Sequence, residues 1–254
     1  MEYITGAHTD IGRVRETNQD AICIMQAQTI KGNVCMAIVC DGMGGLSKGE
    51  VASATIVKAF EKGFEEKLPE LLSKCSLEEI KLLWEKELLF WNKRLSDYGR
   101  KNNISLGTTF SGMLFVENRY LWMHIGDSRI YKIDNQNAEQ ITTDHTVVAR
   151  EIANGNMTLE EAEHSKLRSK LTQCIGTAKE PQPESGIEIV RPGESFLICS
   201  DGFYHKITKE ELSEVNDSLY DSEREADRFC RKTIENIMRR GEKDNISVVV
   251  IKCE

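Results

Sequence analysis

Five aspartates stand at the edges of apolar segments in this sequence. They are Asp20, Asp41, Asp127, Asp201 and Asp244. If those segments are strands whose ends meet, the carboxylates crowd into a partly dry space, where like charges need a counterion to stay ionised. Oxygen ligands select hard ions such as Mg²⁺ or Mn²⁺. The set therefore predicts a divalent metal centre, whereas Asp144, alone before a helical run, is predicted to cap that helix.

The segments that carry these aspartates read as strands. Apolar, β-prone runs cover residues 3–9, 21–28 and 33–41, with turn residues between them. After a helical region, strands are predicted at 106–117, 119–127 and 129–134 and are expected to form an antiparallel meander. Further strands are expected within 187–201 and at 245–253.

Helical periodicity fills the remaining stretches. Apolar residues recur every four positions from Gly49 onward, and again from Leu77 to Leu95. Residues from about 145 to 186 are polar and predict two short helices, with Thr158 and Glu161 forming a capping box. A helical segment is also expected over about 209–239. The order predicts one α+β domain over residues 1–254, with antiparallel sheets covered by helices and a mobile helical insert.

Composition narrows the class of protein. The chain has 254 residues, of which 40% are hydrophobic and 29% charged, and this suits a globular enzyme. Its net charge of -8 argues against nucleic-acid binding. The 8 cysteines are scattered without a C-x-x-C pair, so reduced thiols are expected. No signal peptide or membrane span is expected, and the cytoplasm is the predicted location.

Seven motifs occur in an order that resembles a known family. They are "GRVRETNQD", "CDGMGG", "LGTTFSG", "HIGDSRIY", "TDHTVV", "SDGFY" and "KDNISVVV". The chain is similar, from about Thr5 to Ile251, to the PP2C-like (PPM) metal-dependent protein Ser/Thr phosphatases in their compact bacterial form. The resemblance implies a four-layer α/β/β/α sandwich with two central antiparallel sheets flanked by helices. It also implies a small helical flap at about residues 148–184.

The resemblance assigns a metal role to most of the aspartates. Asp41 would bridge two Mn²⁺ or Mg²⁺ ions, with the Gly42 carbonyl on one of them. Asp201 and Asp244 would complete the other. Asp127, together with Asp201, matches the third-metal site of bacterial members. The glycines that follow Met43 are expected to keep the loop slim for a phosphorylated side chain.

The resemblance also implies the reaction and the partners. A hydroxide bridging the ions would attack the phosphorus of phosphoserine or phosphothreonine, with Arg15 binding the phosphate. Gln19 and Asp20 would hold metal-bound water. Phosphoproteins are the expected substrates, a eukaryotic-like Ser/Thr kinase is the expected opposing partner, and a monomer is the expected state.

Three positions depart from the family pattern. Gln19 replaces a glutamate found in many members, which removes a negative charge and predicts lower metal affinity. Met43 replaces the histidine that acts as general acid in eukaryotic members, so metal-bound water is expected to supply that proton. His205 follows "SDGFY" where the family is more apolar, and its side chain is expected to face solvent.

Two other functions remain open at this point. A two-metal nuclease or related phosphoester hydrolase could use the same carboxylates, but it needs a basic track that a charge of -8 disfavours. The basic run "HSKLRSK" is predicted to be a solvated face, or to hold an acidic phosphopeptide if it lies beside the metals. A phosphoprotein-binding pseudophosphatase would be signalled by lost metal aspartates, and here all five are present.

Overall fold

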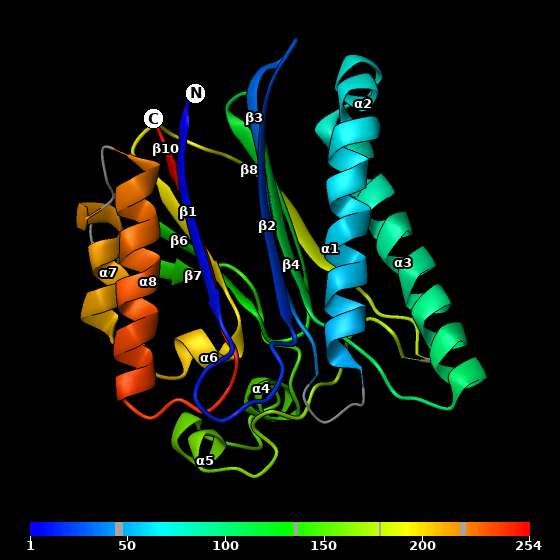
Figure 1. The fold of residues 1–254 in the computed structure, drawn as a ribbon, viewed down its shortest axis with the longest axis vertical. Coiled ribbons are helices and arrows are strands. Elements are labelled where there is room, and N and C mark those ends of the chain that lie inside the picture. The colour runs from blue at the N-terminus through cyan, green and yellow to red at the C-terminus, as the bar shows by residue number, and fades with distance from the viewer. Residues whose placement is uncertain (44–47, 135–136, 178, 219–221) are drawn as a thin grey trace.

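Two five-stranded antiparallel sheets lie face to face at the centre of the molecule (Figure 1). The computed structural model describes residues 1–43, 48–134, 137–177, 179–218 and 222–254. The first sheet has the order β1 (Tyr3–Asp10), β10 (Ile246–Cys253), β9 (Ser195–Cys199), β6 (Arg129–Asp134), β7 (Asn137–Gln140). The second has the order β2 (Asp20–Thr29), β3 (Gly32–Asp41), β4 (Phe110–Val116), β5 (Arg119–Ile125), β8 (Glu184–Ile189).

Helices cover the outer face of each sheet. The second sheet packs against α1 (Gly49–Glu66), α2 (Leu68–Lys74) and α3 (Leu77–Asn102). The first packs against α6 (Asp201–Tyr204), α7 (Lys209–Ser218) and α8 (Glu223–Arg239). Two short helices, α4 (Val147–Ala153) and α5 (Leu159–Glu163), lie at the lower end in Figure 1. The predicted α/β/β/α sandwich is confirmed.

The alternation of side chains along β3 explains why this strand is apolar on both faces. Val34, Met36 and Ile38 pack into the core beneath α1 and α3. Ala37 and Val39 point the other way, into the core between the sheets. Because successive side chains of a strand alternate in direction, a strand buried on both faces must be hydrophobic throughout. This burial anchors the strand that ends at Asp41.

The structure corrects the predicted meander. β4 and β5 pair as expected, but β6 leaves their sheet and pairs with β9 and β7 in the other one. The chain changes sheets at Gly126, whose φ of 113° is open to glycine and strained for other residues. A Cβ at Gly126 would also lie 2.5 Å from Thr109 Cγ2. The segment between β5 and β6 is therefore a crossing from one sheet to the other and not a hairpin turn within one sheet.

Several boundaries also differ from the prediction. The strand expected from residue 106 begins at Phe110, and α2, α6 and β7 were not predicted as separate elements. The capping box of α5 is confirmed, since the Thr158 hydroxyl accepts from Glu161 N–H and the Glu161 carboxylate accepts from Thr158 N–H. None of the helices in the described ranges combines the length and apolarity that crossing a membrane requires.

Candidate metal centre

Strand ends from both sheets meet around one cavity of about 670 Å³. Asp41 closes β3, Asp127 lies in the crossing between β5 and β6, Asp201 follows β9 and opens α6, and Asp244 precedes β10. All four line this cavity, together with Arg15. The structure therefore brings together four of the five aspartates that the sequence singled out.

The fifth, Asp20, lies immediately beside this cavity wall. Asp20 and Asp41 face each other directly in the β2–β3 ladder. Asp20 Oδ2 accepts hydrogen bonds from Ser200 Oγ at 2.8 Å and Ser247 Oγ at 2.6 Å. Within the described part of the chain, its buried Oδ1 has no hydrogen-bond partner. One oxygen is thus fixed in place while the other lacks a donor.

Burial strongly perturbs the acidity of these carboxyl groups. It raises the pKa of Asp20 to about 6 and the pKa of Asp127 to about 7. It also raises the pKa of Asp41 and of Asp201 well above the usual range, and the neighbouring carboxylates add to that rise. Such a group of acids is stable in the ionised form only beside compensating positive charge.

The donor set fits hard divalent cations. The ligand atoms on offer are carboxylate oxygens, and Asp20 Oδ1 lacks a donor among the described residues. Mg²⁺ and Mn²⁺ prefer such oxygens over nitrogen or sulfur ligands. Cys174 lines the same cavity, but burial raises the pKa of its thiol and so disfavours the thiolate that zinc would need.

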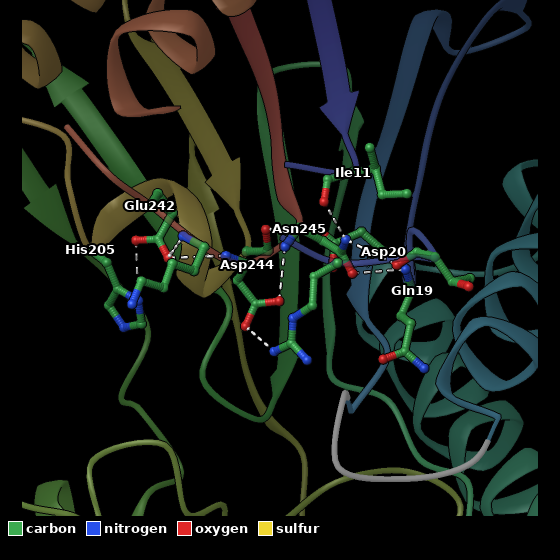
Figure 2. A network of polar contacts seen from close by, with 11 residues as sticks. Ile11, Gln19, Asp20, His205, Glu242, Asp244 and Asn245 are labelled. Atoms are coloured by element: carbon green, nitrogen blue, oxygen red, sulfur yellow. Dashed lines mark hydrogen bonds and ion pairs between the residues drawn. The ribbon is translucent and has the colours of Figure 1, made fainter. Parts of the chain in front are cut away.

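Arg15 points into the same region and pairs with Asp244. Its Nη2 lies 2.6 Å from Asp244 Oδ2, and both side chains are partly exposed, at 38% and 33% (Figure 2). The hydrogen bond with Asp244 raises the pKa of Arg15, and burial opposes that rise. The guanidinium predicted for phosphate and a carboxylate predicted for metal thus neutralise each other here.

Gly42 is needed for close packing rather than for an unusual backbone angle. A Cβ at this position would lie 2.5 Å from both the Gln19 carbonyl oxygen and the Gly49 carbonyl oxygen. Gly42 N–H donates to that same Gln19 oxygen at 3.1 Å. The segment after β3 is therefore clamped between the start of β2 and the first turn of α1. Gly44 and Gly45, predicted to keep the loop slim, lie outside the described residues.

Asn245 organises the loop that carries Arg15, and the sequence reading missed it. Its Oδ1 accepts from Gln19 N–H at 2.9 Å, and its Nδ2 donates to the carbonyls of Ile11 and Thr17 (Figure 2). The loop before β2 is thereby fixed to the residue that follows Asp244. Its position directly after a predicted ligand in "KDNIS" was the available signal. Ser200, directly before Asp201, gave the same kind of signal.

Gln19 faces α1 rather than Asp20. Its Nε2 donates to Glu50 Oε2 at 3.3 Å, and its backbone oxygen accepts from Ser53 Oγ at 2.5 Å. A carboxylate from the first turn of α1 therefore lies next to the position where the family often has a glutamate. The Gln19 amide can donate a hydrogen bond to the Glu50 carboxylate. A glutamate at position 19 could not donate in this way and would repel Glu50.

Two expectations about nearby residues were wrong. His205 is not solvent-facing: 17% of its side chain is exposed, its Nδ1 lies 4.0 Å from Glu242, and burial lowers its pKa to about 4. Asp144 does not cap α4, because Thr146 does so by accepting from Ala149 N–H. Asp144 instead accepts three hydrogen bonds from Arg129, of 2.9, 3.3 and 2.7 Å.

A second group of ligand-type residues lies apart from the aspartates. His124, His145 and Glu184 bring one ligand atom each within 4.8 Å of one another. His145 Nδ1 accepts the Gly126 N–H at 3.1 Å, so its other nitrogen carries the proton. A cation would need that nitrogen's lone pair, and we therefore assign this group to hydrogen bonding at the base of α4. His124 is fully buried.

Several known phosphatases resemble this chain. A family model described as "Protein phosphatase 2C" matches residues 12–247. A "Putative protein phosphatase 2C-type" of Streptococcus pyogenes is 29% identical over 247 residues, which are 97% of this chain and 96% of that protein. Two solved structures are also similar along almost the whole length of both chains.

The first of these is a serine/threonine phosphatase of S. agalactiae, with a TM-score of 0.88, 27% identity and coverage of 100% of both chains. The second is the catalytic domain of the serine threonine protein phosphatase PstP in complex with 2 manganese ions. It has a TM-score of 0.77 and 28% identity, and the match covers 98% of this chain and 97% of that one.

Proposed function

The chain belongs to the protein phosphatase 2C family, and from this premise we propose that its aspartate cavity hydrolyses phosphoserine and phosphothreonine in proteins with the help of divalent ions. One observation carries the proposal: four strand ends from two sheets deliver four carboxylates and one arginine into a single cavity. Carboxylates so close together disfavour one another's ionisation unless cations lie between them. The crowding stores electrostatic strain that bound cations relieve.

We assign the metal-holding roles by position. Asp41 and the Gly42 carbonyl would hold one ion, Asp41, Asp201 and Asp244 the other, and Asp127 with Asp201 a third. Mn²⁺ is the ion named for the PstP structure, and either Mn²⁺ or Mg²⁺ suits these oxygens. When bound, the ions supply the Lewis acidity that makes water nucleophilic near neutral pH.

Arg15 would bind the substrate phosphate. A guanidinium offers a planar pair of donors that matches two non-bridging phosphate oxygens. Arg15 lines the cavity from the loop that Asn245 holds, so its backbone is fixed while its side chain stays 38% exposed. If Asp244 held an ion, the Arg15 guanidinium would lose its present partner and be free to bind phosphate, so metal binding and substrate binding would be coupled.

Asp20 would hold water beside the ions. Ser200 and Ser247 fix its Oδ2 and leave Oδ1 to accept from a further donor. Gln19 is assigned to the same water shell through its neighbour Glu50, which supplies the carboxylate that position 19 lacks. Met43 lines the cavity without an ionisable group, so metal-bound water, rather than this side chain, would supply the proton to the leaving group.

The flap would contact the protein part of the substrate. Ser169, Lys170 and Leu171 line the metal cavity, so the basic run that begins at His164 reaches the site rather than only solvent. Lys170 places a cation where an acidic phosphopeptide would lie. We infer a phosphoprotein substrate on this basis, within a flap that spans about residues 148–184 of a single domain.

We also propose a cellular setting for the protein, on the basis of the family resemblance. A phosphatase of this class is expected to oppose a eukaryotic-like Ser/Thr kinase, to act as a monomer and to work in the cytoplasm. All eight cysteines are free thiols, which suits a reducing compartment.

Phosphate release from a phosphothreonine peptide tests the function. We expect Mn²⁺-dependent release by the wild type and a loss of at least about a hundredfold in kcat/KM for Asp41→Asn and Asp201→Asn. Asp134→Asn, at an exposed aspartate that ends β6, is the matched control and keeps full activity. Equal rates for wild type and the two cavity variants would refute the proposal. Faster cleavage of single-stranded DNA than of the peptide would favour a nuclease.

A further inference from the structure

A second cavity, of about 420 Å³, lies between α1, α2 and α3, on the side of the second sheet that faces away from the other sheet. Its lining includes Phe64 near the C-terminal end of α1, whereas the metal cavity is lined by Asp41 and Met43, which precede the N-terminal end of that helix. Its walls are aromatic and aliphatic: Phe60, Phe64, Leu68, Leu71, Trp84 and Leu114. A cavity of this size and lining has the character of a site for a small apolar ligand.

Gly63 lines the cavity at a position where packing does not require a glycine. Gly63 lies inside α1, where glycine weakens a helix relative to alanine. A Cβ there would meet nothing within 4 Å, whereas a Cβ at Gly99 of α3 would lie 2.8 Å from the Ile104 carbonyl oxygen. Gly99 therefore has a steric reason to be glycine, and Gly63 has the space of the cavity in front of it.

The mouth of the cavity carries positive charge. Lys67, Lys86 and Glu87 belong to the lining. Lys67 lies 3.8 Å from Glu87, so those two charges offset each other. Lys86 has no ion-pair partner within 4.0 Å among the residues that the structure describes. The exposed side chain of Phe90 lies at the same rim, so one uncompensated cation stands beside an apolar opening.

We propose that this cavity binds an amphiphile with a single apolar chain and an anionic head, such as a medium-chain fatty acid. The chain lies against Phe60 and Trp84, whose rings meet edge to face 5.0 Å apart at the wall. The carboxylate lies at the mouth, where Lys86 offers the charge-assisted contact. The site is independent of the metal cavity and does not rest on the phosphatase assignment.

Calorimetric titration of the full chain with decanoate, below its micellar concentration, tests the proposal. We expect saturable one-to-one binding that weakens about fourfold for each methylene removed toward octanoate. Decyltrimethylammonium, with the same chain and the opposite charge, is expected to bind at least tenfold more weakly. Equal binding of the two amphiphiles, or no saturation with decanoate, would overturn the proposal.

Variants locate the site. Gly63→Leu and Ala59→Leu fill the cavity from α1 and are expected to weaken decanoate at least tenfold while the melting temperature is kept or raised. Lys86→Glu is expected to weaken the binding of decanoate and to favour that of decyltrimethylammonium. Lys58→Glu, at an exposed lysine of α1 outside the lining, is the control.

Unchanged decanoate binding in a folded cavity-filling variant would overturn the assignment of the site to this cavity. So would a dimer in sedimentation that Gly63→Leu dissolves, since a second copy would then occupy the cavity.

Discussion

At the scale of single residues, Arg15 and Asp244 bind each other although each is assigned to a different ligand. They contact each other at 2.6 Å, yet one is assigned to phosphate and the other to an ion. The pair is partly exposed, so its own contribution to stability is small, about 0–1 kcal/mol. The pair matters for the proposed function, because an ion bound by Asp244 would have to displace the guanidinium.

Replacement of Arg15 by alanine separates the two roles. Arg15→Ala removes both a competitor for Asp244 and a positive charge near the ions, so Mn²⁺ affinity is expected to rise by about two- to tenfold. The same change removes the guanidinium that is proposed to bind the substrate phosphate, and kcat/KM is expected to fall by about 10- to 100-fold. Calorimetry with Mn²⁺ and steady-state kinetics measure the two effects. A fall in both Mn²⁺ affinity and kcat/KM would contradict the roles assigned to Arg15 and Asp244.

Gln19 stands where many family members carry a glutamate, and we expect it to lower the affinity for metal. Gln19→Glu is expected to tighten Mn²⁺ binding by about three- to tenfold, because it adds a charge near the water shell of the ions. The new carboxylate would also face Glu50, whose Oε2 lies 3.3 Å from the present amide nitrogen. Gln19→Glu combined with Glu50→Gln is therefore the matched control, and it should return the Mn²⁺ affinity toward the wild-type value. Weaker binding by Gln19→Glu alone would contradict this account.

His124 makes stability depend on pH. Burial lowers its pKa from 6.5 to about 3, so the unfolded chain binds a proton below pH 6.5 that the native protein does not. The contribution of His124 is therefore present above pH 6.5 and is lost as the pH falls toward 3.

The variant His124→Asn has a side-chain amide that can donate to or accept from Ser111, but it does not titrate. Between pH 7 and 5, the free energy of unfolding of the wild type is expected to fall by about 2 kcal/mol more than that of the variant. Urea unfolding of both proteins at the two pH values measures the difference. Identical pH slopes would show that His124 is protonated in the native protein.

At the scale of elements, the metal centre depends on how closely β3 approaches α1. Gly42 allows the carbonyls of Gln19 and Gly49 to lie where its Cβ would be, 2.5 Å away from each. The apolar run of β3, buried on both faces, supports this contact from behind. The position of Asp41 is thus a property of the packing of two elements.

Gly42→Ala tests that packing. One methyl group must push β3 and α1 apart, so the free energy of unfolding is expected to drop by about 1–3 kcal/mol and activity by more than about tenfold. Gly63→Ala in the same helix is the control, since a Cβ there meets nothing within 4 Å, and it should not destabilise the protein. A Gly42→Ala protein with wild-type stability and activity would show that the close approach is not required.

The sequence allowed much of this architecture to be predicted, and its failures have physical causes. The apolar run 33–41 predicts a strand, because a strand that is buried on both faces must be apolar along its length. The aspartate at the end of the run is therefore predicted to lie at a strand end. The change of sheet at Gly126 could not be predicted, since a tight turn and a crossing use the same residues. Ser247, a partner of Asp20, lies 227 residues away in the chain, and Arg129, the partner of Asp144, lies beyond β7, so local patterns did not predict either pair.

At the scale of the whole molecule, two sheets of different topology are needed to assemble one site. Asp20 and Asp41 come from the second sheet, and Asp201 and Asp244 flank strands of the first. The net charge of -8 repels an anionic substrate at long range, so local cations must attract it. Arg15 and Lys170 are cationic residues of the cavity lining, and the bound ions would add to their charge.

Titration of Mn²⁺ into the chelator-treated protein tests the central claim most directly. Calorimetry is expected to give at least two ions per chain for the wild type and for Asp134→Asn. In Asp41→Asn the loss of the bridging carboxylate should weaken both high-affinity ions by at least about a hundredfold, with the fold retained by circular dichroism. Binding of two ions to Asp41→Asn with wild-type affinity would contradict the account.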